Sequence, residues 1–329
     1  MVQCIRVDKK EANKVKINLI KKNILNKEYK IKHEKESILI PVTKGYKNYK
    51  ILKEKLEPIK EKSIGLNKLL EKIGNKKEIK NLRTSLEVIG EIAILELDKE
   101  LLKKKQMIGE AILKSNKNLK SVLLKVGGRH GTFRLQDYEY LAGFQDTETI
   151  YKESGISIKL DPKKTYFTPR LGSERLRIAK QVKNENVLVM FSGVGIYPFI
   201  IAKYSKAKSI IGIEINPDAN YYAEESLKIN KFKNIEFICA DVREAHIHGT
   251  FDRIVMPAPE CAMLYLDLAI KLIKNKGIIH LYFFSEENKL NEKINFIKEK
   301  VNCKILEKVK CGQKSPKVYR YCIDLQVLE

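Results

Sequence analysis

The stretch NVLVMFSGVGIYPF, residues 186–199, decides the fold of this chain. An apolar run typical of a buried strand is followed directly by Gly193 and Gly195. Glycines at such a place let the backbone approach a ligand closely, and ligands of α/β sheets bind outside the carboxyl ends of the strands. A dinucleotide site would have a third glycine where Pro198 stands. The loop therefore predicts another nucleotide-type cofactor, although a lone Gly-x-Gly pair is also typical of an ordinary turn.

The residues that follow this stretch alternate between apolar strands and helical segments. Further strands are expected in SIIGIEI, IEFICA, DRIVMP and GIIHLYFF, with helices at roughly 196–206, 217–230 and 260–274. Such alternation predicts a parallel sheet covered on both faces. KILEKVKC and YRYCIDLQVL are joined by a short loop, so they should form an antiparallel hairpin at one edge. This outline is that of an α/β, class I (Rossmann-like) methyltransferase domain over residues 171–329.

Two smaller α+β domains are expected before it. Residues 1–60 begin as strand, helix and strand, and residues 61–80 form a lysine-rich linker. The whole stretch 45–80 is dense in lysine and predicts short helical pieces. In the middle domain, residues 81–170, EVIGEIAILEL is expected to be one strand and DKELLKKKQMIGEAILKSN a helix.

The composition favours a polyanionic partner. There are 64 Lys plus Arg against 41 Asp plus Glu, a net charge of +23, which attracts nucleic acid or an anionic membrane face. Nucleotide bias in the genome is an alternative source of the lysines. The six cysteines are scattered without a C-x-x-C pair, and no signal peptide or long apolar run is evident. We therefore expect a cytoplasmic protein without zinc, disulfides or a membrane segment.

Acidic residues follow the next two predicted strands. Glu214 ends SIIGIEI, where a carboxylate can accept both hydrogen bonds of a ribose diol. Asp241 follows IEFICA, where it can meet an adenine amino group. Each acid could instead cap the helix after it. Together with the glycine loop, they favour S-adenosyl-L-methionine as the cofactor.

With these residues in place, the chain resembles the archaeal and eukaryotic tRNA (guanine-37-N1)-methyltransferase family. The likeness covers nearly the whole chain, and its most specific segments are GTFR and PRLGSER. It implies transfer of a methyl group to N1 of the guanosine just 3′ of the anticodon. N1 must lose its proton as it attacks, so a general base is required, and the match implies Glu174. Arg134 would stabilise the negative charge that spreads to O6.

Each of these roles has a simpler rival. Glu174 could serve only to stabilise the first turn of a helix, and Arg134 is one basic residue among 64. Arg129, His130 and Arg170 could contact phosphates or be solvated surface charges. The cofactor-binding residues that this interpretation predicts are Arg175, Phe191, Gly193, Gly195, Glu214, Ile215, Asp241, Val242 and Pro257.

The chain departs from the family pattern at two positions. Val189 stands where members often have an acid, and Pro257-Ala258-Pro259 replaces Asn-Leu-Pro or Asn-Pro-Pro. The missing Asn side chain would leave orientation of the base to backbone carbonyls near Met256 and Pro257.

We expect a monomer without metal that binds tRNA at its anticodon loop and elbow, with the target base flipped out of its stack. The alternatives are a wyosine-pathway transferase that moves a methyl or aminocarboxypropyl group at the same nucleotide, and a non-catalytic RNA-binding protein with a decayed cofactor site.

Overall fold

The computed structural model of the chain describes residues 1–26, 28–47, 49–57, 70 and 86–328. The chain divides into two compact units, Met1–Leu69 and Leu70–Glu329. The expected linker, residues 61–80, lies outside the described residues apart from Leu70, and the three-domain division stays a prediction. Among the described residues, no helix combines the length and apolar character that crossing a bilayer requires.

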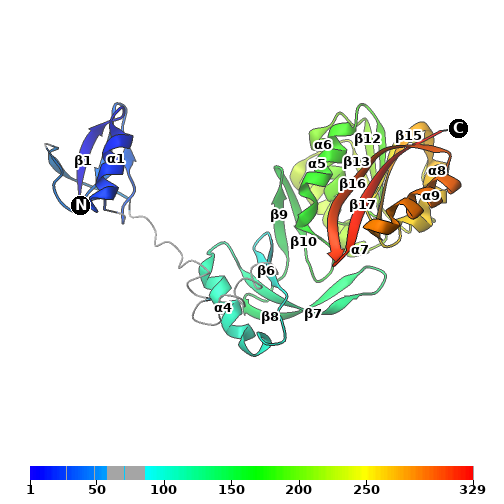
Figure 1. Cartoon of the computed structure of the whole chain (residues 1–329), viewed down its shortest axis with the longest axis horizontal. Helices are drawn as coiled ribbons and strands as arrows, with labels where there is room; N and C mark the ends of the chain where they lie inside the picture. Colours follow the sequence, from blue (N-terminus) through cyan, green and yellow to red (C-terminus); the bar gives the residue numbers. More distant parts are fainter. Residues whose placement is uncertain (27, 48, 58–69, 71–85, 329) are drawn as a thin grey trace. The chain divides into compact units, whose positions relative to one another are not determined.

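In its described residues, the first unit is a four-stranded antiparallel sheet with one helix (Figure 1). Val15 and Leu19 of the helix pack on Ile5 and Ile40 of the sheet. The fourth strand falls where we predicted only short helical pieces. Its residues alternate between half-buried and exposed, so pairing with the free edge of the first strand, and not burial, defines it. The elements are β1 (Val2–Asp8), α1 (Ala12–Lys21), β2 (Lys32–His33), β3 (Ser37–Pro41) and β4 (Ile51–Glu54).

The second unit begins with a small sheet of order β5-β6-β7-β8. Residues 87–97, predicted as one strand, form two strands joined by a turn at Gly90, whose φ is +57°. A Cβ at Gly90 would collide with Thr149, so the turn requires glycine. The elements are β5 (Glu87–Ile89), β6 (Ile92–Leu95), η1 (Leu102–Lys104), α4 (Lys105–Ser115), β7 (Ser121–His130), β8 (Leu135–Gly143), and the hairpin β9 (Thr149–Glu153) and β10 (Ile156–Leu160).

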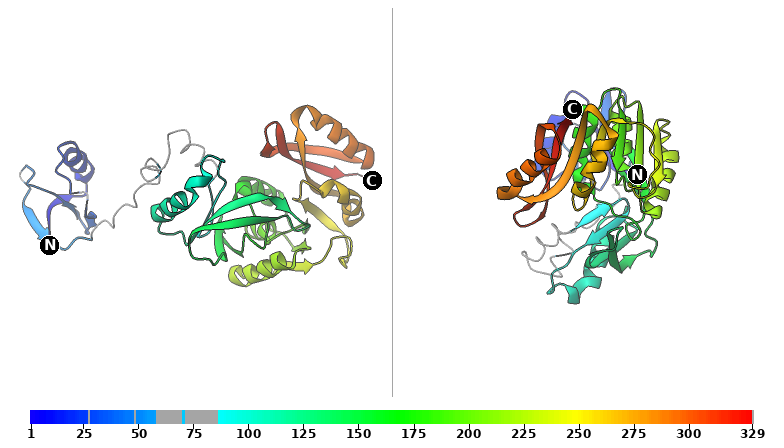
Figure 2. Two further views of the ribbon diagram at one scale, coloured as in Figure 1. Left: turned by 90° about the horizontal axis from the view of Figure 1, so that it is seen from below. Right: turned by 90° about the vertical axis from the view of Figure 1, so that its right-hand side faces the viewer.

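A seven-stranded sheet of order β13-β12-β11-β14-β15-β17-β16 follows, which confirms the predicted class I fold. Figures 1 and 2 show its course from three directions. The first five strands are parallel, and β17 runs antiparallel between β15 and β16. The elements are η2 (Pro169–Leu171), α5 (Gly172–Gln181), β11 (Asn186–Met190), α6 (Ile196–Tyr204), β12 (Ser209–Glu214), α7 (Pro217–Asn230), β13 (Ile235–Cys239), β14 (Phe251–Met256), η3 (Ala262–Tyr265), α8 (Leu266–Leu272), β15 (Ile273–Glu286), η4 (Glu287–Lys289), α9 (Leu290–Lys300), β16 (Cys303–Ser315) and β17 (Val318–Val327).

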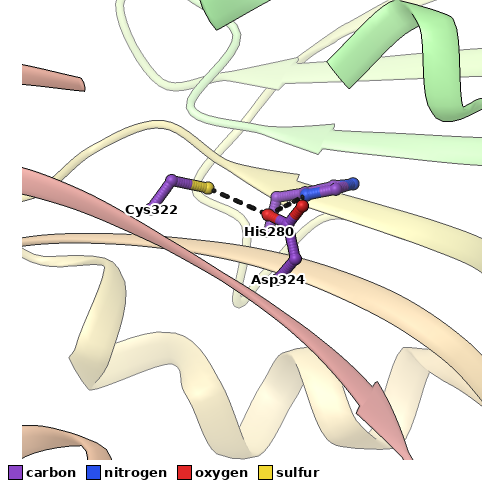
Figure 3. Close-up of side chains that lie close together, drawn as sticks. All are labelled: His280, Cys322 and Asp324. Atoms are coloured by element: carbon purple, nitrogen blue, oxygen red, sulfur yellow. Dashed lines mark hydrogen bonds and ion pairs between the residues drawn. The ribbon is translucent and has the colours of Figure 1, made fainter. Parts of the chain in front are cut away.

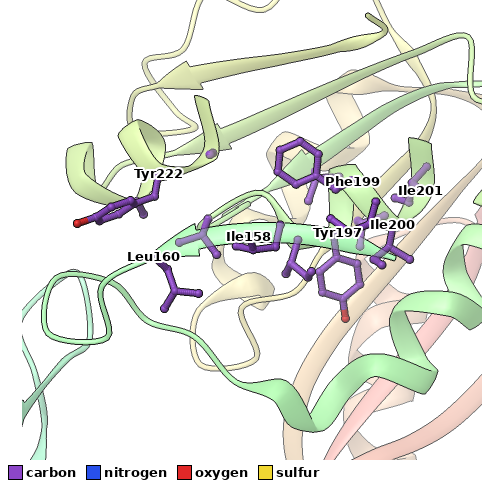
Figure 4. Close-up of a cluster of buried hydrophobic side chains, with 14 of the residues drawn as sticks. Ile158, Leu160, Tyr197, Phe199, Ile200, Ile201 and Tyr222 are labelled. Carbon is purple, nitrogen blue, oxygen red and sulfur yellow. The ribbon is translucent and has the colours of Figure 1, made fainter. Parts of the chain in front are cut away.

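The two faces of this sheet have separate cores. Val187 and Val189 of β11 lie in the core that includes residues of α5, α6 and α7, part of which is drawn in Figure 4. Leu188 and Met190 lie in the other core, with residues of α8 and α9. Alternate burial follows from the two-residue period of a strand, and each buried side chain contributes about 1.5–3 kcal/mol. The chain reverses its direction across the sheet between β11 and β14, and this switch point is where ligands of such sheets bind.

Candidate active site

A cavity of ≈ 410 Å³ lies at the carboxyl ends of β11, β12 and β14, and we call it the central cavity. Three parts of the second unit form its wall: the loops after these strands, the β7–β8 turn of the small sheet with the segment before α5, and the β16–β17 hairpin. Residues from these parts include 191–194, 214–216, 257–261, Arg129, 132–134, 166–168, Arg170, 311–314 and Arg320.

The glycine loop holds the carboxylate of Glu214 in place. The Gly193 amide donates to Oε2 of Glu214 at 2.8 Å, and the Asn216 amide donates to Oε1 at 2.9 Å. Burial raises the pKa of Glu214, and the backbone amides offset only part of this effect. Gly195 has a φ of +81°, and a Cβ there would lie 2.6 Å from Cζ of Phe237. Gly195 therefore shapes the loop without lining the cavity.

The cavity wall fits an adenosine-type cofactor. Glu214 offers an acceptor pair for a ribose diol, and Phe191 and Ile215 offer apolar surface. Within the described part of the chain, Ser192 Oγ and Arg320 Nε are buried in this wall without a hydrogen-bond partner. Buried polar atoms without partners are rare in folded proteins, and a polar ligand would satisfy them. The volume is also within the usual range of about 300–1,000 Å³ for ligand sites. Pro257 and Arg175 complete the predicted residues that line the cavity.

Asp241 and Val242, which we expected to bind the cofactor, are not among the residues that line this cavity, and their role stays a prediction. Arg243 donates to the Asp241 carboxylate through Nε at 3.0 Å and Nη2 at 2.5 Å. These hydrogen bonds lower the pKa of Asp241. Val242 is 4% exposed and packs in the core beside α8 and α9. The sequence did not reveal that an arginine two residues on would take both oxygens.

Glu174 also lies outside the cavity wall, although its neighbour Arg175 is part of it. Arg177 donates to both Glu174 oxygens at 2.8 Å, and the Tyr282 hydroxyl donates to Oε1 at 2.7 Å. The Glu174 side chain is only 4% exposed. In this arrangement buried donors hold both oxygens of the carboxylate, and the role of Glu174 as general base stays a prediction. Arg175 is itself bound to Glu153 of β9.

Behind Glu174, a buried polar network joins α5 to the sheet, and Figure 3 shows three of its members, His280, Cys322 and Asp324. Arg177 donates to Asp324, whose carboxylate lies 2.7 Å from Nδ1 of His280. Arg253 approaches Nε2 of His280 at 2.6 Å. An arginine only donates, so Nε2 accepts and the His280 proton lies on Nδ1. Cys322 completes the cluster in Figure 3, and its Sγ donates to Oδ1 of Asp324 at 3.3 Å.

Three lining residues of interest were missed at the sequence level. Tyr166 has Arg129 over its ring at 4.3 Å and Arg134 at 5.6 Å. Burial alone would raise the pKa of Tyr166, but Arg129, Arg320 and Arg134 outweigh it and the net pKa is lowered. Glu260 and Lys314 form an ion pair at 2.8 Å. No local pattern distinguishes these residues from the many other tyrosines, acids and lysines of the chain.

The fold and the cavity define a class I methyltransferase that uses S-adenosylmethionine. Residues 149–306 match the TRM5/TYW2 methyltransferase domain, residues 66–147 the TYW2 N-terminal domain and residues 4–50 the tRNA methyltransferase 5 N-terminal domain. Solved structures similar to this chain hold adenosine or S-adenosylmethionine.

Relatives cover the full length of the chain. The tRNA (guanine(37)-N(1))-methyltransferase Trm5b of Pyrococcus abyssi is 36% identical over 335 residues, which cover 99% of each chain. A solved complex of aTrm5 and tRNALeu has a TM-score of 0.77 and 30% identity, covering 98% of this chain and 99% of that one. The chain belongs to the tRNA (guanine-37-N1)-methyltransferase family. A tRNA(Phe) (4-demethylwyosine(37)-C(7)) aminocarboxypropyltransferase of Methanocaldococcus jannaschii is 34% identical over 62% of this chain and 85% of its own length.

Proposed function

We propose that this chain methylates N1 of guanosine 37 in tRNA. The observation that carries the proposal is that Arg134 of the β7–β8 turn and Glu214 of the sheet line one cavity. One wall of that cavity suits an adenosine-type cofactor, and another presents arginines suited to a nucleic acid. The position of the substrate nucleotide is inferred from the relatives.

The chemistry divides among few side chains. When bound, the cofactor supplies an electrophilic methyl group. Glu214 accepts hydrogen bonds from the ribose hydroxyls, and Arg134 donates to O6 of guanine as negative charge develops there. Glu174 takes the N1 proton, which requires its carboxylate to leave Arg177 and turn toward the cavity that Arg175 lines. Asp241 contacts the adenine amino group once Arg243 releases one of its oxygens.

The rest of the chain positions the tRNA. The N-terminal unit binds the elbow and the small sheet binds the anticodon stem, so a single chain suffices for the reaction. The target base leaves its stack to enter the cavity. Lysines that contact phosphates supply much of the affinity.

Unmodified tRNA transcripts with G37 or A37 test this proposal. We expect labelled methyl transfer to G37 only, and equal labelling of both would refute it. Glu174→Gln should bind cofactor normally but lose about 10²–10⁴-fold in turnover, the range for loss of a general base. Glu299→Gln makes the same change on the exposed end of α9 and should be fully active. Full activity of Glu174→Gln would remove Glu174 from the mechanism.

A wyosine-pathway transferase is the second candidate, and the match to the aminocarboxypropyltransferase favours it. Mass analysis of the nucleoside product separates the two functions, because the transferred groups differ in mass. Calorimetry with S-adenosylmethionine tests the third possibility of a decayed site, for which no heat of binding is expected.

A further inference from the structure

Glu260 stands beside Arg134 on the wall of the central cavity. It follows Pro257-Ala258-Pro259 at the end of β14, in a turn closed by the Cys261 and Ala262 amides, which donate to the Ala258 carbonyl. The Glu260 carboxylate lies 3.3 Å from Nη2 of Arg134 and 2.8 Å from Nζ of Lys314. The β7–β8 turn, the loop after β14 and the β16–β17 hairpin therefore meet at this one carboxylate.

The other two acids that line the cavity, Glu214 and Glu87, are also held by partners. Glu214 is held by the Gly193 and Asn216 amides, and Glu87 pairs with Arg170 and Lys125. Burial alone would raise the pKa of Glu260, but Lys314 and Arg134 outweigh it and the pKa is lowered. Glu260 is thus an ionised acceptor at neutral pH, and about a third of its side chain is exposed.

A guanidinium beside a carboxylate matches the Watson–Crick edge of guanine. That edge presents the O6 acceptor next to two donors, N1–H and the 2-amino group. The arginine can donate to O6 while the carboxylate accepts from the 2-amino group. Adenine presents a donor at N6 and an acceptor at N1, so the same pair of side chains would oppose it.

We infer that Glu260 is a specificity-determining residue, which accepts a hydrogen bond from the 2-amino group of the target guanine while Arg134 donates to O6. The inference rests on the proposed function, because it assumes that guanosine 37 enters the central cavity. Lys314 holds the carboxylate in the cavity wall before and after the base arrives.

Transcripts that carry inosine at position 37 test the inference, because inosine lacks only the 2-amino group. A hydrogen bond to a charged acceptor predicts that wild-type kcat/KM favours G37 over I37 by about 10- to 100-fold. In Glu260→Ala this ratio should fall to near one. Glu299→Ala, an acid removed from the exposed end of α9, should keep the wild-type ratio.

A Glu260→Ala variant that loses activity equally on both transcripts, and so keeps the ratio, would overturn the inference. If Glu260→Ala fails to fold or to bind S-adenosylmethionine, Glu260→Gln decides. Its neutral amide oxygen should give a ratio several-fold below that of the wild type, and an unchanged ratio again overturns the inference. No methylation of G37 by the wild type would instead refute the proposed function.

Discussion

Glu214 is a half-buried carboxylate that must be ionised to accept hydrogen bonds from two hydroxyl groups. Burial raises its pKa, and a ligand that donates hydrogen bonds to the carboxylate favours the charged form. The affinity for S-adenosylmethionine should therefore weaken as the pH falls toward this raised pKa. Calorimetry from about pH 7.5 down to about pH 5 should show the decline in the wild type. Glu214→Gln should bind at least 10-fold more weakly and without this pH dependence. A wild-type affinity that stays constant over this range would argue against a cofactor on Glu214.

Two glycines with similar φ angles allow the cost of steric crowding to be measured apart from the cost of backbone strain. Gly195 has a φ of +81° and Gly249 one of +85°. A Cβ added to Gly195 would collide with the ring of Phe237, whereas a Cβ added to Gly249 would meet no atom within 4 Å. Both changes to alanine should cost about 1 kcal/mol through the left-handed φ. Gly195→Ala should lose about 1–3 kcal/mol more, because Phe237 and Phe199 must move. Urea unfolding measures the difference, and equal losses would show that the loop adapts freely.

For single residues, the sequence predicts which ones lie near the site better than it predicts where their side chains point. Gly193 and Glu214 line one cavity because the carboxyl ends of parallel strands meet at one edge of the sheet, and Arg134 reaches the same cavity from the β7–β8 turn. The direction of Glu174 depends on Arg177 and Tyr282, and Tyr282 is 108 residues away in the chain. Glu260 escaped notice for a similar reason, since its partners Arg134 and Lys314 come from other elements.

The contact between α5, β15 and β17 depends on a histidine that stays neutral. Burial lowers the pKa of His280, although Asp324 opposes this effect. Below about pH 6.5 the histidine is protonated in the unfolded chain but stays neutral in the folded chain. Its contribution to the free energy of unfolding is therefore fully present above this pH and declines below it. We expect a slope of up to about 1.4 kcal/mol per pH unit from this residue.

Urea unfolding at about pH 7.5 and about pH 5.5 measures this decline. In His280→Gln the contribution should disappear, while the exposed His130→Gln should unfold like the wild type at both values. An identical pH dependence in His280→Gln and the wild type would contradict a neutral His280.

Among the elements, those with strong apolar periodicity were the ones predicted. The strands of the large sheet and the final hairpin are confirmed, since runs such as NVLVMF are buried on both faces. β4 was missed because ILKE is half-exposed and its only strand partner among the described residues is β1. The turn at Gly90 was missed because the apolar residues continue on both sides of it.

The residues that line the central cavity and the first unit, which carries many of the lysines, are separate parts of the chain. Every described residue that lines the central cavity lies at or beyond Glu87, whereas the first unit ends at Leu69. Deletion of residues 1–69 should therefore leave the affinity for S-adenosylmethionine unchanged and weaken tRNA binding. The slope of log affinity against log salt concentration should also become shallower, because fewer phosphates are contacted. Loss of cofactor binding on deletion would show that the first unit is needed for the second to fold.

The place of β17 inside the sheet has a consequence for synthesis on the ribosome. β16 precedes β17 in the chain, yet its strand neighbour in the large sheet is β17, and β17 lies between it and β15. The nascent chain can thus assemble β11 to β15 early, but β16 must wait until the residues after it have emerged from the exit tunnel. Arg320 and Asp324 arrive with β17, so the binding site and the network behind it are completed together, once this strand has emerged.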